Sequence, residues 1–425
     1  MIQKVNLFLN KKELFIVVIT LFLFILSRLF ISYINYKDFI SKPFYYTNAK
    51  VITIYPQSAK NIQDSSQLVK VKSKEGYIFF IYLNSKRSFK NQKVRVKLIP
   101  NKEIRFIDFM TISFFKYKIK DIFLTKNIES KFEILQKEII SQHKNNFISE
   151  FYSAIFLATP ISKELRLQVS KLGVSHLIAL SGFHLSILWI FIYKLIAIPY
   201  KYTQKRYFPY RHSLLDIGFI TILTLGFYLW FVDMPPSLIR SYSMILFAWI
   251  LTLLGIEIFS FSFLLMIVLG LLSIDISLFF SIAFWLSVSG VFYIYLIGLH
   301  TKNIKNKIFK YLIFPIGIFF LMLPVVHTIF DITSILQPFS ILLSLIFILF
   351  YPISIFLHIL GYGYIFDKYL LLLIDVSSKE LSYLMPLTFD ILLIYLIVSI
   401  TSIFSKNIFW FLVLISISYA IYLFI

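Results

Sequence analysis

The chain has 425 residues, of which 59% are hydrophobic and 15% are charged. A soluble protein of this size carries about 25% charged residues, so the composition excludes an ordinary soluble domain and indicates a membrane protein. The absence of cysteine excludes disulfides, thiolate metal sites and a cysteine nucleophile. The formal net charge of +21 favours a polyanionic partner or anionic membrane lipids. AT-rich codons would produce part of the same lysine excess, so the positions of the basic residues decide its meaning.

The first apolar run, residues 14–34, follows Lys4, Lys11 and Lys12. Basic residues beside a span stay in the cytoplasm, so residues 1–40 are predicted to form a transmembrane helix with a cytoplasmic N-terminus. The run is too long for the apolar core of a signal peptide and lacks a small-residue cleavage site. We therefore expect this helix to remain in the protein.

Residues 41–125 differ from the rest, because their apolar runs are short and alternate with lysine. The segments 68–72, 92–98 and 115–120 each repeat this alternation with a period of two, which is typical of half-buried strands. Several such strands in about 80 residues predict a small β-barrel or curled sheet on the extracytoplasmic side. The basic residues of the predicted strands are Lys70, Lys72, Lys93, Arg95, Lys97, Lys116, Lys118 and Lys120.

These lysines have aromatic neighbours, namely Tyr77, Phe79, Tyr82 and Phe89. Basic tracks interleaved with aromatic residues suit single-stranded nucleic acid, since the charges neutralise phosphates and bases stack on rings. The alternative is a solvated lysine face that discourages pairing at the sheet edges.

Residues 126–160 are predicted to form an amphipathic helix that leads into a membrane domain at 161–425. That domain contains about ten apolar segments, among them 173–198, 335–360 and 369–385. The fold class is therefore a polytopic α-helical membrane protein of about 10–11 transmembrane helices, with the small β-domain inserted after the first helix. The basic loops at 201–211 and 302–310 are predicted to be cytoplasmic.

Polar residues interrupt one of the apolar segments, 173–188, which reads GVSHLIALSGFHLSIL. Such a segment at membrane depth is either buried in protein or lines a water-filled cavity, and we expect it to line a path. Interhelical hydrogen bonding with close packing at Gly182 is the alternative. Later helices add Arg240, for which Asp233 or Glu257 is a candidate partner. The predicted path-lining residues are His176, Ser181, Gly182, His184, Arg240 and Ser287.

Catalysis by this segment is not favoured. Ser181 and His184 have no carboxylate at a diagnostic spacing, as a serine–histidine triad would require. His176 and His184 are eight residues apart, whereas zinc-binding helices place histidines closer together. We therefore predict no catalytic residue, no metal and no cofactor.

The segment GVSHLIALSGFHLSIL resembles the signature helix of the ComEC family of competence proteins. PPSLIRSYSMI resembles the family's next block, and FWLSVSG resembles a later one, although Trp285 stands where glutamine is usual. The resemblance covers about residues 147–360. It implies an inner-membrane channel for single-stranded DNA in natural transformation, with an OB-like external domain (OB, oligonucleotide-binding).

Many family members also carry a C-terminal metallo-β-lactamase-like domain. This chain contains no His-x-His-x-Asp-His cluster, so we expect no nuclease activity in it and a separate nuclease for the other strand. It also lacks a phosphate-binding glycine loop followed by lysine. The expected partners are single-stranded DNA, membrane lipids, a periplasmic DNA receptor, and a cytoplasmic motor or single-strand-binding protein. The rival interpretation is a transporter or flippase for an anionic lipid or polysaccharide precursor.

Overall fold

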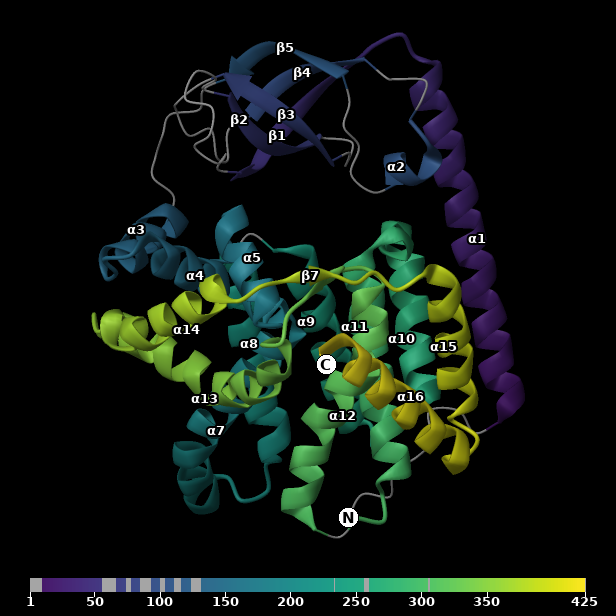
Figure 1. Ribbon diagram of the computed structural model, residues 1–425, viewed down its shortest axis with the longest axis vertical. Coiled ribbons are helices and arrows are strands. Elements are labelled where there is room, and N and C mark those ends of the chain that lie inside the picture. Colours follow the sequence, from purple (N-terminus) through teal and green to yellow (C-terminus); the bar gives the residue numbers. More distant parts are fainter. Residues whose placement is uncertain are drawn as a thin grey trace. The chain divides into compact units, whose positions relative to one another are not determined.

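The computed structural model describes residues 10–55, 66–73, 78–84, 93–99, 104–110, 116–123, 131–232, 234–255, 260–304 and 306–424. The chain divides into two compact units (Figure 1). The smaller unit comprises Asn10–Ile134 and Val268–Ile282, and the larger unit comprises the remaining residues.

The smaller unit begins with the long helix α1 (Lys11–Ser41). It is the most apolar of the long helices. Lys42, which follows it, has an extended backbone with φ −82° and ψ 133°. The residue before a proline is disfavoured in the helical region, so Pro43 explains why α1 ends here.

Five antiparallel strands form the sheet of the smaller unit, in the order β3-β2-β1-β4-β5. The central strand β1 pairs with β2 through its second half and with β4 through its first half, and its register shifts between Val51 and Thr53. The buried side chains of this sheet include Ala49, Val51, Val71 and Val96. The strands are β1 (Tyr45–Tyr55), β2 (Ser66–Ser73), β3 (Ile78–Asn84), β4 (Lys93–Ile99) and β5 (Lys116–Phe123).

The three strands predicted from lysine alternation correspond to β2, β4 and β5. The expected barrel is not observed, because in the described part of the chain β3 and β5 remain at the edges and no pairing joins them. The sheet is open. Alternation along a strand predicts which residues are buried, but closure depends on the pairing of distant edges, which leaves no such pattern.

Aromatic contacts hold the short helix α2 (Phe106–Met110) against α1 and the 3₁₀ helix η1 (Ile276–Phe280). The ring of Phe106 meets Tyr36 and Phe280 edge-on, at centroid distances of 5.5 Å and 6.2 Å. The hydroxyl of Tyr36 donates to the Ile104 carbonyl oxygen at 2.6 Å. The smaller unit is therefore a helix–sheet assembly with its own packed contacts.

Six helices in the described residues are long and apolar enough to cross a membrane, so the chain is a multi-pass membrane protein. Besides α1 they are α7 (Gly182–Tyr207), α8 (Ser213–Phe231), α11 (Ile282–His300), α13 (Ser340–Ile359) and α16 (Lys406–Phe424). Four apolar helices are shorter: α9 (Pro236–Leu253), α10 (Phe261–Ile274), α12 (Lys307–His327, apolar from Leu312) and α15 (Phe389–Thr401).

Two predicted spans need correction. The segment 173–198 is not one helix, since α6 (Ser175–Ile178) ends before α7 begins at Gly182, and α7 continues to Tyr207 through the expected basic loop. The predicted span 369–385 is instead α14 (Asp367–Lys379), a helix of 13 residues with four charged side chains. Such a helix is too short and too polar to cross a bilayer by itself.

The lead-in to the bundle is also divided. The expected amphipathic helix is split into α3 (Lys131–Ser141) and α4 (Asn146–Leu157), and α4 begins where the side chain of Asn145 accepts from the Phe147 amide at 2.8 Å. The helix α5 (Lys163–Lys171) follows. Further along, two short strands, β6 (Ile332–Thr333) and β7 (Tyr383–Leu384), pair antiparallel. The segment that contains α13 and α14 therefore begins and ends at the β6–β7 pair.

Candidate functional site

The polar segment predicted from the sequence forms the break between α6 and α7. Ser181 has an extended backbone, and its N–H donates to Nδ1 of His184 at 3.3 Å. The Ser181 hydroxyl lies 3.4 Å from the same nitrogen. This is an N-terminal capping arrangement, which satisfies polar groups that the start of α7 would otherwise leave free.

His184 is fully buried, at 0% exposure. Its ring meets Phe347 and Tyr351 of α13 edge-on, at centroid distances of 5.1 Å and 4.9 Å. The Nε2 atom is buried and has no hydrogen-bond partner among the described residues. Because Nδ1 accepts a hydrogen bond, Nε2 carries the proton of the neutral ring. The structure therefore places His184 in aromatic packing that fixes the break.

Gly182 and the start of α9 approach each other closely. A Cβ atom on Gly182 would lie 2.9 Å from the Ser241 hydroxyl oxygen, nearer than such atoms pack. One turn earlier, the Ser237 hydroxyl donates to the Leu180 carbonyl oxygen at 2.9 Å. Non-helical backbone at membrane depth requires partners of this kind, so α9 stabilises the break directly.

Arg240 lies on α9 with only 9% of its surface exposed. Its Nη2 donates to the Ala283 carbonyl oxygen at 3.3 Å, and its guanidinium carbon is 5.5 Å from the Phe284 ring centroid. Its Nε is buried without a partner among the described residues. The partners considered from the sequence, Asp233 and Glu257, lie outside those residues. Arg240 is a buried cation held by a carbonyl group and a ring face.

The remaining two predicted residues lie apart from the break itself. His176 is exposed, and its Nε2 lies 3.3 Å from the Ser344 hydroxyl on α13. Ser287 is half-buried on α11, one turn beyond Ala283. The structure thus places Gly182 against α9, and both His184 and His176 against α13. Sequence spacing alone does not show these interhelical pairings.

The sheet of the smaller unit provides a second candidate site. Tyr46 and Phe44 are 40% and 47% exposed. The Lys97 ammonium lies 4.5 Å from the Phe44 ring centroid and 5.7 Å from that of Tyr46, and the Arg95 guanidinium lies 5.9 Å from Tyr46. Exposed rings beside cations are the elements from which single-strand binding surfaces are built.

The register aligns basic residues across neighbouring strands. Lys50 of β1 pairs with Lys93 of β4 on one side and Lys72 of β2 on the other. A second row joins Lys97 of β4 to Lys118 of β5. Like charges directly opposite each other destabilise a sheet. These two rows, Lys93–Lys50–Lys72 and Lys97–Lys118, are called the lysine rows below.

The described side chains sharpen the nucleic-acid prediction. Phe79 is fully buried, so it cannot stack on a base as expected, and the exposed rings are Phe44 and Tyr46 instead. Lys72 is exposed, whereas Lys70 is half-buried and burial lowers its pKa. Side-chain positions of four predicted residues lie outside the described part: Lys93, Lys116, Lys118 and Lys120. Tyr77 and Phe89 also lie outside it, as does the side chain of Tyr82.

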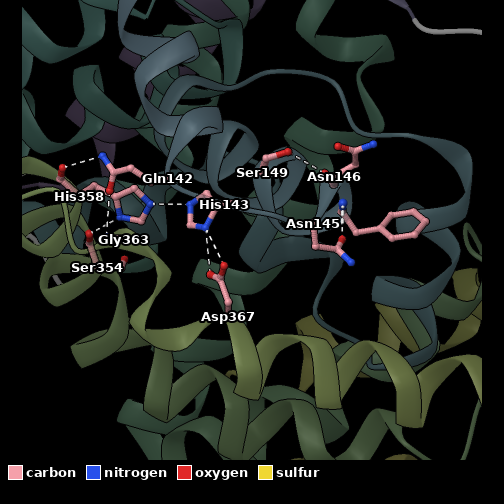
Figure 2. A network of polar contacts seen from close by, with 10 residues as sticks. Gln142, His143, Asn145, Asn146, Ser149, Ser354, His358, Gly363 and Asp367 are labelled. Atoms are coloured by element: carbon pink, nitrogen blue, oxygen red, sulfur yellow. Dashed lines mark hydrogen bonds and ion pairs between the residues drawn. The ribbon is translucent and has the colours of Figure 1, made fainter.

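Sequence reasoning missed one polar network in the larger unit (Figure 2). Its members are Gln142 and His143 before α4, His358 at the end of α13, and Asp367 at the start of α14. His143 and His358 are 215 residues apart, so no local pattern relates them. Among the described residues, no group of three or more His, Asp or Glu side chains is placed to hold a metal ion.

The long apolar helices define a multi-pass membrane protein, and α9 and α13 pack against the break between α6 and α7. Residues 158–424 match the family model described as Competence protein, which is more than half of the chain. The chain therefore belongs to the competence protein family, as the signature segment indicated. The match begins after the sheet and does not include it. Neither the curated proteins nor the solved structures gave a match.

Proposed function

We propose that the chain is an inner-membrane channel that passes single-stranded DNA into the bacterial cytoplasm during natural transformation. Family membership supports a role in DNA uptake. The observation that carries the further step is the sheet, whose register pairs the lysines of the lysine rows and which exposes the rings of Phe44 and Tyr46. Opposed lysines are unfavourable alone and become favourable when a phosphate backbone neutralises them.

The strand order β3-β2-β1-β4-β5 supports an OB-like assignment for this sheet. OB domains are five-stranded, partly open Greek-key barrels whose sheet face binds oligonucleotides. The long central strand β1, which pairs with β2 and β4 around a register shift, fits that design. In this proposal the sheet is extracytoplasmic and the N-terminus is cytoplasmic, as the basic residues near α1 predict.

The break between α6 and α7 is proposed as part of the wall of the path. His176 on α6 is proposed to present its exposed imidazole to the path, while Gly182 and His184 hold the geometry of the break through Ser241 and α13. Arg240 and Ser287 are proposed to contribute polar groups from α9 and α11. Discontinuous helices recur at the sites of membrane transporters, where their free ends face the cargo.

The chain by itself does not complete the process in this proposal. A periplasmic DNA receptor delivers the DNA, a separate nuclease degrades the other strand, and a cytoplasmic motor or single-strand-binding protein draws the strand inward. This chain contributes the binding and passage steps.

The proposal is tested with the full chain in lipid nanodiscs and short single-stranded oligonucleotides at two salt concentrations. The double variant Arg95→Glu with Lys97→Glu should bind at least about tenfold more weakly at low salt, with a shallower salt dependence, because two phosphate contacts are lost. The matched control, Lys163→Glu with Arg166→Glu, reverses two exposed charges on α5 and should bind like the parent.

Equal loss of affinity in both double variants would show that the net charge of the protein, and not the sheet surface, causes the loss. No binding of single strands by the parent chain would contradict the proposal and favour the transporter or flippase for an anionic lipid or polysaccharide precursor.

A further inference from the structure

The turn between α3 and α4 is fastened to the α13–α14 corner by two consecutive residues. The side chain of Gln142 donates to the His358 carbonyl oxygen at 3.1 Å and accepts from the Gly363 amide at 2.9 Å. A Cβ atom on Gly363 would lie 2.5 Å from the Gln142 amide oxygen, so the contact requires glycine there. The next residue, His143, makes the contacts that decide the chemistry (Figure 2).

Three hydrogen-bond links form a chain from α14 through the turn to α13. Nδ1 of His143 lies 2.9 Å from an Asp367 carboxylate oxygen, and Nε2 of His143 lies 3.0 Å from Nε2 of His358. Nδ1 of His358 lies 2.6 Å from the Ser354 carbonyl oxygen. A carbonyl oxygen only accepts, so His358 carries its proton on Nδ1 and its Nε2 accepts. Nε2 of His143 must then donate.

The three hydrogen bonds between Asp367, His143, His358 and Ser354 require one more proton than these groups ordinarily carry. Each of the three links needs one proton, which makes three. A charged aspartate with two neutral histidines supplies two, one on each ring. With only two protons, one link would set two lone pairs against each other at about 3 Å, which is repulsive.

The charges and burial around His143 also favour the state with the third proton. His143 is buried, and the Asp367 side chain is 18% exposed. An unpaired carboxylate there would be a poorly solvated charge, whereas an added proton on His143 makes an ion pair of zero net charge. Tyr152 stacks on the His143 ring at 4.6 Å and 9°, which favours an imidazolium cation.

The titratable groups that face the two rings, among the described residues, are Tyr152 of α4 and Asp367 of α14. Burial, with a contribution from the charge of Asp367, raises the pKa of the Tyr152 hydroxyl above its usual range, so this group stays neutral. Lys144 and Lys368, the neighbours along the chain, are exposed. The η3 segment (Gly363–Phe366) between α13 and α14 contributes a backbone amide.

We propose that Asp367, His143 and His358 form a proton-binding site, and that the bound proton fastens the α3–α4 turn to the α13–α14 corner. When the proton leaves, the contact between the two imidazole rings opens and Gln142 loosens from Gly363. The site lies outside the polar break of α6 and α7 and does not depend on DNA being the cargo.

The test measures hydrogen exchange at the Gly363 amide in the full chain, corrected for the intrinsic effect of pH. Protection should fall about tenfold between about pH 6 and about pH 9 as one charge-assisted bond is lost. In Asp367→Asn the amide donates to Nδ1 of His143, so every link is satisfied without the added proton and protection should be independent of pH. The matched control Asp375→Asn, on the exposed side of α14, should follow the parent chain.

Constant protection in the parent chain, or Asp367→Asn following the parent, would overturn the proposal. Loss of the pH dependence in Asp375→Asn would also overturn it. If Asp367→Asn does not fold, ¹⁵N-histidine spectra of the parent decide, since the chain has only seven histidines. Both ring nitrogens of His143 should be protonated at about pH 6; a ring with one unprotonated nitrogen at every pH would refute the site.

Discussion

At the scale of single residues, the break between α6 and α7 depends on Gly182. The start of α9 comes so near that a methyl group at this position meets the Ser241 hydroxyl at 2.9 Å. The backbone of Gly182 is helical, so the requirement for glycine is spatial and not conformational. Ser241 is the residue that crowds this position, so a smaller residue in place of Ser241 should relieve the crowding.

Gly182→Ala should destabilise the protein by about 1–3 kcal/mol, because overpacking forces α7 and α9 apart. Adding Ser241→Gly should restore much of that loss by removing both crowding atoms. Thermal unfolding in detergent and transformation frequency would be measured for the single and double variants. A double variant no better than Gly182→Ala would show that the harm arises elsewhere than at this contact.

Arg240 is the second residue whose environment makes a prediction. Its guanidinium is held by the Ala283 carbonyl oxygen and the ring of Phe284. Arg240→Lys keeps the charge but loses the planar group that stacks on a ring, so we expect loss of stability of about 1 kcal/mol or more. Denaturant unfolding followed by tryptophan fluorescence would measure it, and a variant as stable as the parent would argue against the ring contact.

At the scale of elements, the pairing of β6 with β7 constrains the membrane topology. Ile335, next to β6, and Leu381, next to β7, must lie on the same side of the membrane, because Ile332 and Leu384 are register partners. The chain contains no cysteine, so single cysteines can report on this directly.

Ile335→Cys and Leu381→Cys should react with a membrane-impermeant maleimide from the same side. Tyr210→Cys, in the loop between α7 and α8, should react from the opposite side if that loop is cytoplasmic as its charge predicts. Labelling of Ile335→Cys and Leu381→Cys from opposite sides would be incompatible with the β6–β7 pair.

The sequence predicted elements whose residues are close along the chain. Lysine alternation located β2, β4 and β5, and apolar length located α1, α8 and α13, because period and length are local properties. The open sheet was missed because it depends on the pairing of distant strands, and the division of α6 from α7 was missed because it depends on contacts with α9 and α13. The short α14 was missed although its four charged side chains are a local signal, because the apolar run inside it was interpreted as a span. The same reason explains why His143, His358 and Asp367 were not recognised as one network.

At the scale of the whole molecule, part of the net charge of +21 is concentrated in the lysine rows of the sheet, where lysines are register partners. In the DNA-free protein, raising salt from about 50 mM to about 500 mM should slow hydrogen exchange in β1, because it screens the opposed lysines. Lys72→Thr should slow exchange in β1 at low salt and weaken this dependence. A salt response identical in the parent and in Lys72→Thr would place the repulsion outside the lysine rows.

If the sheet binds single-stranded DNA as proposed, the lysine rows couple its stability to that ligand. Salt ions that stabilise the DNA-free sheet would then compete with the nucleic acid for the same lysines, so salt would raise stability and lower affinity. A bound strand would itself act as the counterion of these lysines. The empty protein in dilute buffer should then be its most fragile form, and purification in the presence of short oligonucleotides should preserve it.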